Sequence, residues 1–170
     1  HCRVGMAGAG KILCGTAKLH QHSDFVDQFA GHRTNDVGAQ NPVGTGIGGG
    51  IIINRDLLRG AHGAAGEIGH MNVVVNGRAC GCGRGGCWEQ YASGNALVRE
   101  ARALAADPRG EATLLLGLGD GTPEGIQGLH VTEAARAGDP VAMEAFRVIG
   151  TWLGRGLADL CAILDPGTFV

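Results

Sequence analysis

The feature that most constrains this chain is one short segment that carries a histidine and three cysteines: His70, Cys80, Cys82 and Cys87. Three thiolates and one imidazole complete a tetrahedral set for a structural zinc ion, and soft sulfur ligands select zinc over calcium or magnesium. Glycines separate the cysteines, and their conformational freedom lets the loop turn back so that the sulfur atoms converge. The pattern predicts a zinc-binding loop; the alternative is a chance grouping of unrelated residues with a disulfide among them.

Carboxylates flank this cluster on both sides. Glu67 lies three residues before the histidine, and Glu89 lies two residues after the last cysteine. A metal loop that fixes two carboxylates and an imidazole beside one another is suited to holding a polyol, because charged acceptors bind hydroxyl groups strongly. For each glutamate taken alone, the alternative is an ordinary solvated acid.

Composition narrows the class of protein. The chain has 170 residues, 44% of them apolar, which suits one domain with a sizeable core. A net charge of -2 gives no electrostatic reason to bind nucleic acid or a membrane surface. We expect neither a bilayer-spanning segment nor a signal peptide, since no apolar run has the required length or flanks. The other three cysteines are scattered along the chain, which favours a reducing, cytoplasmic setting.

The sequence changes character near residue 43. Residues 1–43 hold no sustained period of 2 or 3.6, and we assign no helix or strand there. From Gly44 onward a glycine run leads into a β-branched strand at Ile51–Ile53, followed by a polar turn. Leu57 and Leu58 then continue as the second arm of a hairpin.

The glycine run is predicted to lie between strands rather than ahead of a helix. It lacks a Lys-Ser/Thr pair, which excludes a Walker loop, and it does not match a dinucleotide-binding fingerprint. Successive backbone N–H groups can still form a concave anion site, and a threonine hydroxyl adds a donor. The candidate phosphate-binding residues are Gly44, Thr45, Gly46 and Gly48. The alternative is a tight hairpin that holds no ligand.

Caps predict two of the helices in the second half. Ser93 is a suitable N-cap for a helix over about 95–106. Asp139, followed by Pro140, starts a long helix that ends at Asp165-Pro166-Gly167. The predicted apolar stripe of this long helix comprises Val141, Ala145, Val148, Trp152, Leu153, Leu157, Leu160 and Leu164.

The remaining segments are predicted with less regular structure. Residues 109–129 are predicted to form a glycine-interrupted connector, and Thr132–Ala137 a short helix. Thr168–Val170 has the composition of an opening strand. Because that strand would begin just where the sequence stops, we expect the chain to be a fragment.

Three motifs in combination resemble the ROK family of bacterial sugar kinases and sugar-responsive repressors. They are the glycine run Gly44–Ile51, the segment Gly63–His70 and the segment Cys80–Ser93. The resemblance covers about residues 44–170 and implies an α/β fold, part of an actin-like, ribonuclease-H-like sugar kinase in which two lobes enclose a cleft. The second lobe would be truncated here, and residues 1–43 would be an atypical lead-in. The glycine run and the tail resemble the glucokinases of high-GC bacteria in particular.

The resemblance also implies roles for the flanking side chains. Glu67 and His70 would bind sugar hydroxyls, with Glu89 reaching the anomeric side. His70 would use one ring nitrogen for a structural zinc ion and the other for the sugar. The implied reaction is glucokinase-type transfer of a phosphoryl group from ATP, with its Mg²⁺, to the 6-hydroxyl of glucose at the entry to glycolysis. We also expect a homo-oligomer.

The sequence departs from the family pattern in its first part. It contains no Asp-x-Gly-Gly-Thr phosphate loop of the kind that opens the family's first lobe. The family's catalytic base is an Asp that follows Asn within a helix; Asn35-Asp36 has the dipeptide but lies only eight residues before Gly44. Asp36 is therefore a weak candidate, and the catalytic residue stays unassigned. We expect the 170-residue chain by itself not to phosphorylate glucose at a useful rate.

Two other functions are open. One is the sugar-sensing domain of a ROK-type transcriptional repressor; the intact glycine run and the lack of a helix-turn-helix pattern in residues 1–43 favour a kinase over it. The other is a kinase for a different hexose, such as N-acetylglucosamine, mannose or fructose. The sequence does not distinguish among these sugars, or ATP from polyphosphate as the donor.

Overall fold

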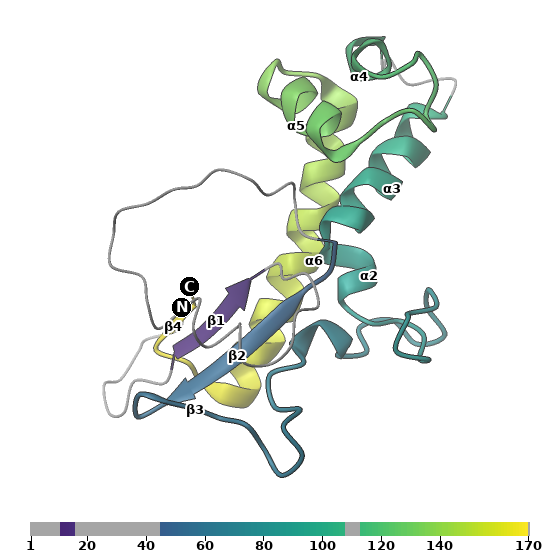
Figure 1. The fold of residues 1–170 in the computed structure, drawn as a ribbon. Helices are drawn as coiled ribbons and strands as arrows, with labels where there is room; N and C mark the ends of the chain where they lie inside the picture. Colours follow the sequence, from purple (N-terminus) through teal and green to yellow (C-terminus); the bar gives the residue numbers. More distant parts are fainter. Residues whose placement is uncertain (1–10, 16–44, 108–112, 170) are drawn as a thin grey trace.

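The protein has a small mixed sheet at one end and a group of helices at the other, joined by one long helix (Figure 1). This computed structural model describes residues 11–15, 45–107 and 113–169. The described segments combine strands and helices, in agreement with the predicted α/β class. No helix within these ranges has both the length and the apolar character needed to cross a bilayer.

The sheet has the strand order β3-β2-β1-β4. β1 pairs antiparallel with β2 and parallel with β4, and β2 pairs antiparallel with β3. Asn54 and Arg55 form the turn between β2 and β3 with φ of 54° and 72°, so both occupy the left-handed region, as in the tight turns that match strand twist. The strand bounds are β1 Lys11–Gly15, β2 Gly48–Ile53, β3 Asp56–Leu57 and β4 Thr168–Phe169.

Two sequence expectations fail in the sheet. Residues 1–43 contain β1, where we assigned no strand, and β2 begins at Gly48, so half of the glycine run lies within a strand rather than between strands. Gly49 and Gly50 pair with residues of β1. A Cβ at Gly49 would lie only 2.5 Å from Ile68 Cδ1, so the close packing of η1 (Ile68–His70) on the strand requires glycine. Strand propensity misses this segment because tertiary contacts decide its structure.

The predicted caps of the two principal helices are confirmed. Ser93 Oγ accepts a hydrogen bond from the Ala96 amide at 3.2 Å, and Asp139 Oδ1 accepts one from the Ala142 amide at 2.9 Å. The long helix ends before Asp165, which has a left-handed φ of 41°. The helix bounds are α2 Glu89–Ala92, α3 Gly94–Ala105, α4 Thr113–Leu118, α5 Gly128–Arg136 and α6 Pro140–Leu164.

The predicted connector over residues 109–129 is wrong in part. α4 lies within it, and α5 begins at Gly128, ahead of the predicted start at Thr132. Asp139 Oδ2 accepts a hydrogen bond from the Leu115 amide at 3.2 Å, and the Leu115 side chain is fully buried. The short helix α4 therefore depends on a residue far along the chain, which local periodicity does not reveal.

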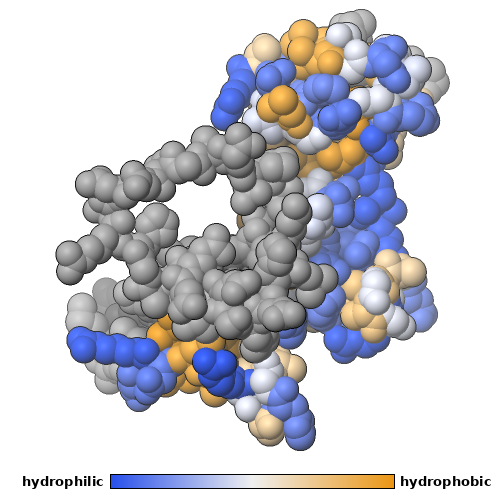
Figure 2. Space-filling model, in the orientation of Figure 1, coloured by the Kyte–Doolittle hydropathy of each residue, from blue (hydrophilic) through white to orange (hydrophobic). Residues whose placement is uncertain are grey.

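Two apolar clusters hold the described parts together, and α6 passes through both. The helical-end cluster lies among α3, α4, α5 and the first half of α6; Figure 2 shows that this end also exposes some apolar surface. The sheet-end cluster lies between the second half of α6, the sheet and the segment before α2. Of the predicted apolar stripe of α6, Val141, Ala145 and Leu160 are buried, as expected. Leu164 is exposed. The helical-end cluster comprises Leu97, Ala101, Ala105, Leu115, Ile126, Val131, Ala134, Val141, Ala142 and Ala145, and the sheet-end cluster Ile47, Ile68, Trp88, Ala92 and Leu160.

Candidate functional site

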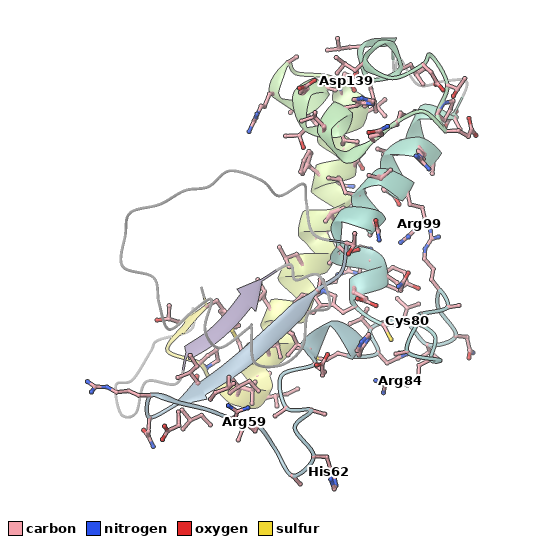
Figure 3. All side chains as sticks on the ribbon, viewed as in Figure 1. Arg59, His62, Cys80, Arg84, Arg99 and Asp139 are labelled. Atoms are coloured by element: carbon pink, nitrogen blue, oxygen red, sulfur yellow. The ribbon has the colours of Figure 1, made fainter. Side chains whose placement is uncertain are left out.

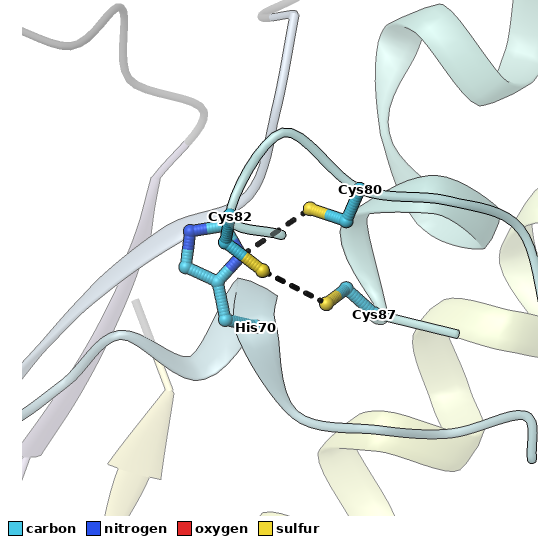
Figure 4. A group of neighbouring side chains, drawn as sticks. All are labelled: His70, Cys80, Cys82 and Cys87. Atoms are coloured by element: carbon cyan, nitrogen blue, oxygen red, sulfur yellow. Dashed lines mark hydrogen bonds between the residues drawn. The ribbon is translucent and has the colours of Figure 1, made fainter. Parts of the chain in front are cut away.

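The structure brings the four predicted metal ligands together (Figure 4). Cys80 Sγ lies 3.6 Å from His70 Nδ1, and Cys82 Sγ lies 3.5 Å from Cys87 Sγ. One ligand atom from each of the four residues lies within 4.8 Å of all the others. A tetrahedron with Zn–S bonds of about 2.3 Å and a Zn–N bond of about 2.0 Å has edges of roughly 3.5–3.8 Å. The donor set and its spacing therefore fit one zinc ion.

Backbone hydrogen bonds shape the segment that carries these ligands, residues 70–88, which we call the metal loop. The Trp88 amide donates to the Met71 carbonyl and the Val73 amide to the Gly86 carbonyl, both at 2.8 Å. Gly86 has a φ of 77°, and a Cβ there would collide with the Val74 carbonyl oxygen. The two ends of the loop are thus paired side by side with Cys87 opposite Asn72, which brings Cys87 close to His70.

The three thiols have different electrostatic surroundings. The backbone N–H of Arg84 is the main factor that lowers the pKa of Cys82 to about 6, and the Arg84 side chain adds to it. Burial raises the pKa of Cys80 to about 12 and also raises the pKa of Cys87. Without metal, Cys82 is thus the most acidic of the three thiols. Zinc binding would require the other two thiols to lose their protons.

Glycines present Glu67 and His70 on one side of η1. Gly66 has a φ of 92° and packs against Gly49, where a Cβ would meet the carbonyl oxygen at 2.8 Å. A Cβ at Gly69 would collide with the Ile47 carbonyl oxygen. Since Gly66 lies directly against β2 and Gly69 against Ile47 just ahead of it, the glutamate and histidine side chains are left facing the open side.

These side chains line one cavity of about 620 Å³ together with the candidate phosphate residues. Thr45 and Gly46 lie in a bend ahead of β2, Gly48 is the first residue of that strand, and all three line the cavity. The sequence-predicted sugar residues Glu67, His70 and Glu89 also line it. Gly44 and Asp36 lie outside the described residues.

Glu89 lies at the junction of the metal loop and this cavity. Its Oε1 accepts a hydrogen bond from Cys80 Sγ at 3.0 Å and lies 3.7 Å from His70 Nδ1. Its backbone begins α2 directly after Trp88, whose fully buried indole donates from Nε1 to the Trp152 carbonyl of α6 at 2.8 Å. The carboxylate therefore extends from a well-anchored backbone.

Sequence reasoning missed several cavity residues. Arg59, Gln90, Asn95 and Arg99 also line the cavity, and Figure 3 shows Arg99 on α3 above the metal loop. The Arg99 guanidinium donates to the Gln90 carbonyl, and burial lowers its pKa, with a smaller contribution from Arg78. The predicted Ser93 cap could have indicated that Asn95 and Arg99 follow on the first turns of α3. No pattern in the sequence indicates Arg59.

Comparison with known proteins identifies the class of this protein. The sequence model of the ROK family matches residues 17–170, so the chain belongs to the ROK family. This match begins ahead of the motifs that carry the sequence resemblance, which start at Gly44. The fold is accordingly the actin-like fold of the ROK sugar kinases.

Similar proteins include both kinases and repressors. A glucokinase from Streptomyces coelicolor is 54% identical over 75% of this chain, which covers 40% of that protein. A xylose repressor from Bacillus spizizenii is 31% identical over 96% of the chain, which covers 34% of that protein. A crystal structure of a ROK family glucokinase from Streptomyces griseus, in complex with glucose and AMPPNP, aligns with 98% of this chain and 45% of its own, at 44% identity and a TM-score of 0.75. The chain thus spans less than half the length of these relatives.

Proposed function

We propose that this chain is part of a glucokinase, which transfers a phosphoryl group from ATP to the 6-hydroxyl of glucose. The observation that supports this most directly is that the candidate phosphate residues and the candidate sugar residues line the same cavity. Phosphoryl transfer depends mainly on holding donor and acceptor in line and on stabilising charge. The 54% identity to a Streptomyces glucokinase, and the glucose and AMPPNP bound by the S. griseus enzyme, support the same choice of substrates.

In this proposal the sugar is held by Glu67, His70 and Glu89. The two carboxylates accept hydrogen bonds from sugar hydroxyls, and a charged acceptor discriminates strongly against an analogue that lacks the matching hydroxyl. His70 Nδ1 faces the thiols, with Cys80 Sγ at 3.6 Å, which leaves Nε2 for the sugar. Metal ligation at one ring nitrogen would fix the tautomer that the other presents.

The nucleotide would lie on the glycine side of the cavity. Gly44, Thr45, Gly46 and Gly48 are the proposed phosphate residues, with Mg²⁺ arriving on the ATP. The sugar oxygen forms the new O–P bond, ADP leaves, and the hydroxyl proton passes to a general base. We assign no such base among the described residues, and Asp36 stays a weak candidate.

We propose that zinc is the ion held by His70, Cys80, Cys82 and Cys87. The close approach of the four ligand atoms and their soft donors support zinc. Four protein ligands fill a tetrahedral ion, so zinc would hold the metal loop in place and leave no position for chemistry.

The sugar sensor of a repressor is a second candidate, because xylose repressors are also similar to this chain. Kinase and sensor would share the sugar side of the cavity and differ on the nucleotide side. Titration of the zinc-loaded chain with AMPPNP and Mg²⁺ distinguishes them: binding supports the kinase, and its absence together with sugar binding supports the sensor. A panel of glucose, mannose, fructose and N-acetylglucosamine tests the choice of hexose.

Glu67→Gln tests the sugar site itself. The substitution keeps the size of the side chain but removes the charged acceptor, so glucose affinity should fall by about 1.5–3 kcal/mol. Isothermal titration measures this, with Glu124→Gln as the control, because Glu124 is exposed between α4 and α5 at the far end of the molecule. Unchanged glucose affinity in Glu67→Gln would mean that Glu67 is only a solvated acid.

A further inference from the structure

The glycine segment and the metal loop meet at one close contact, between Gly46 and Glu89. A Cβ built on Gly46 would lie 2.7 Å from Glu89 Oε2 and 3.8 Å from the carboxylate carbon. The 2.7 Å distance is too short for a real contact, whereas 3.8 Å is ordinary van der Waals contact, so Glu89 Oε2 occupies the space that a Cβ at position 46 would need. Gly46 and Glu89 come from segments far apart in the sequence.

Other groups also lie close to the Glu89 carboxylate. On the opposite side Oε1 lies 3.0 Å from Cys80 Sγ. Behind it, the Trp88 indole is locked against α6, where a Cβ at Gly156 would collide with the ring. The carboxylate thus lies between Cys80 Sγ, a candidate metal ligand, and the bare Cα of Gly46.

From this arrangement we propose that Gly46 is a positioning residue for the Glu89 carboxylate and so sets the geometry of the sugar site, a role that rests on the proposed sugar binding by Glu89. Gly46 acts through its lack of a side chain, because the Glu89 carboxylate lies where a Cβ of residue 46 would be. The same bend contains the candidate phosphate residue Thr45. Displacement of this bend would therefore move the carboxylate, which couples the phosphate side of the cavity to the sugar side.

The contact also makes the proposal testable without unfolding the protein. At Gly49, Gly66 and Gly69 an added Cβ would meet packed Ile68 or backbone atoms, which cannot move freely. At Gly46 it meets the end of a flexible glutamate side chain. Gly46→Ala should therefore displace the carboxylate and leave the fold and the metal loop intact.

The experiment is a double-mutant cycle with the zinc-loaded chain and glucose as the probe. Gly46→Ala should weaken glucose binding by about 10-fold or more, as expected when a hydrogen bond to a charged group is lost. In a Glu89→Ala background the same substitution should change binding by less than about 2-fold, because the group it displaces is gone. Gly150→Ala is the matched control, since a Cβ there meets nothing within 4 Å.

Two further measurements separate a positioning role from general damage. Zinc content should stay at one ion per chain in Gly46→Ala, and its crystal structure should show the Glu89 carboxylate moved while the backbone of β2 and α2 stays in place. A carboxylate that keeps its position, or an equal loss of glucose binding in both backgrounds, would overturn the proposal. If the unsubstituted chain binds no glucose, the proposed sugar binding by this chain is wrong, and the crystal structure alone decides whether Gly46 positions Glu89.

Discussion

The metal loop and the helical end of this protein are stabilised in opposite ways. The helical end packs ten buried apolar residues from α3, α4, α5 and α6 and the segments between them into one cluster. In the metal loop, Cys80, Cys87 and Trp88 are the buried apolar residues, and two of these three are candidate metal ligands. Its shape depends on backbone hydrogen bonds, glycines and the convergence of three sulfur atoms on one imidazole.

This difference shows that the helical end, which carries most of the apolar packing, is separate from the loop that carries the candidate site residues. The helical end is held by apolar side chains, so its fold does not depend on a bound ion. A glycine-rich loop with few buried side chains cannot offset its conformational entropy by burial, so it needs another source of order. We expect the ion to order the loop that carries Glu89 and to leave the helical end unaffected.

We therefore expect the largest effect when zinc is removed. Structural zinc contributes on the order of 10 kcal/mol of folding free energy in small modules. Chelation, or Cys82→Ser, should remove the ion and abolish hydrogen-exchange protection of the amides in residues 71–88, while protection in residues 131–145 persists. Metal analysis and peptide-resolved exchange measure both.

The control for this prediction is Cys161→Ser. Cys161 is exposed on α6 and is not part of the four-residue cluster, so its substitution should leave the zinc content unchanged. Protein that contains no zinc and has paired thiols would disprove the metal assignment, and equal loss of protection at both ends would remove the distinction between them.

The converse substitution is Leu115→Ala at the helical end. Leu115 is fully buried in the helical-end cluster, and truncation of such a side chain costs about 2–5 kcal/mol through lost burial and the cavity left behind. Chemical denaturation should show this loss, while zinc content and glucose affinity stay close to those of the unsubstituted chain. A fall in zinc content would show that the two regions are coupled through α6.

The smallest effect is expected from Gly150→Ala. Gly150 is exposed within α6, and a Cβ there meets nothing within 4 Å. Alanine should raise the free energy of unfolding by about 0.5–1 kcal/mol, because glycine loses more backbone entropy in a helix. Thermal unfolding detects a change of this size, and a destabilised variant would contradict the prediction.

The sequence predicts the parts of this structure that depend on local chemistry. The caps at Ser93 and Asp139 depend on side-chain oxygens next to helix starts, and both are observed. The metal ligands depend on residue type and spacing, and their side chains converge as expected.

The features that the sequence does not predict depend on contacts between distant segments. β1 is a short strand in a glycine-rich context and is defined by its pairing with β2 and β4. α4 depends on the second carboxylate oxygen of Asp139. Arg59, which follows β3, and Arg99 on α3 line the cavity because of where these segments pack, and no local pattern indicates that.

The burial of Trp88 has a practical consequence for following this protein in solution. Its indole is fully buried, adjoins Cys87 in the chain and donates to a carbonyl of α6. The chain's other tryptophan, Trp152, lies with its ring centroid 4.9 Å from that of Tyr91. Trp88 is thus a built-in fluorophore at the base of the metal loop, and we expect its emission to change when that loop loses its order, without an attached label.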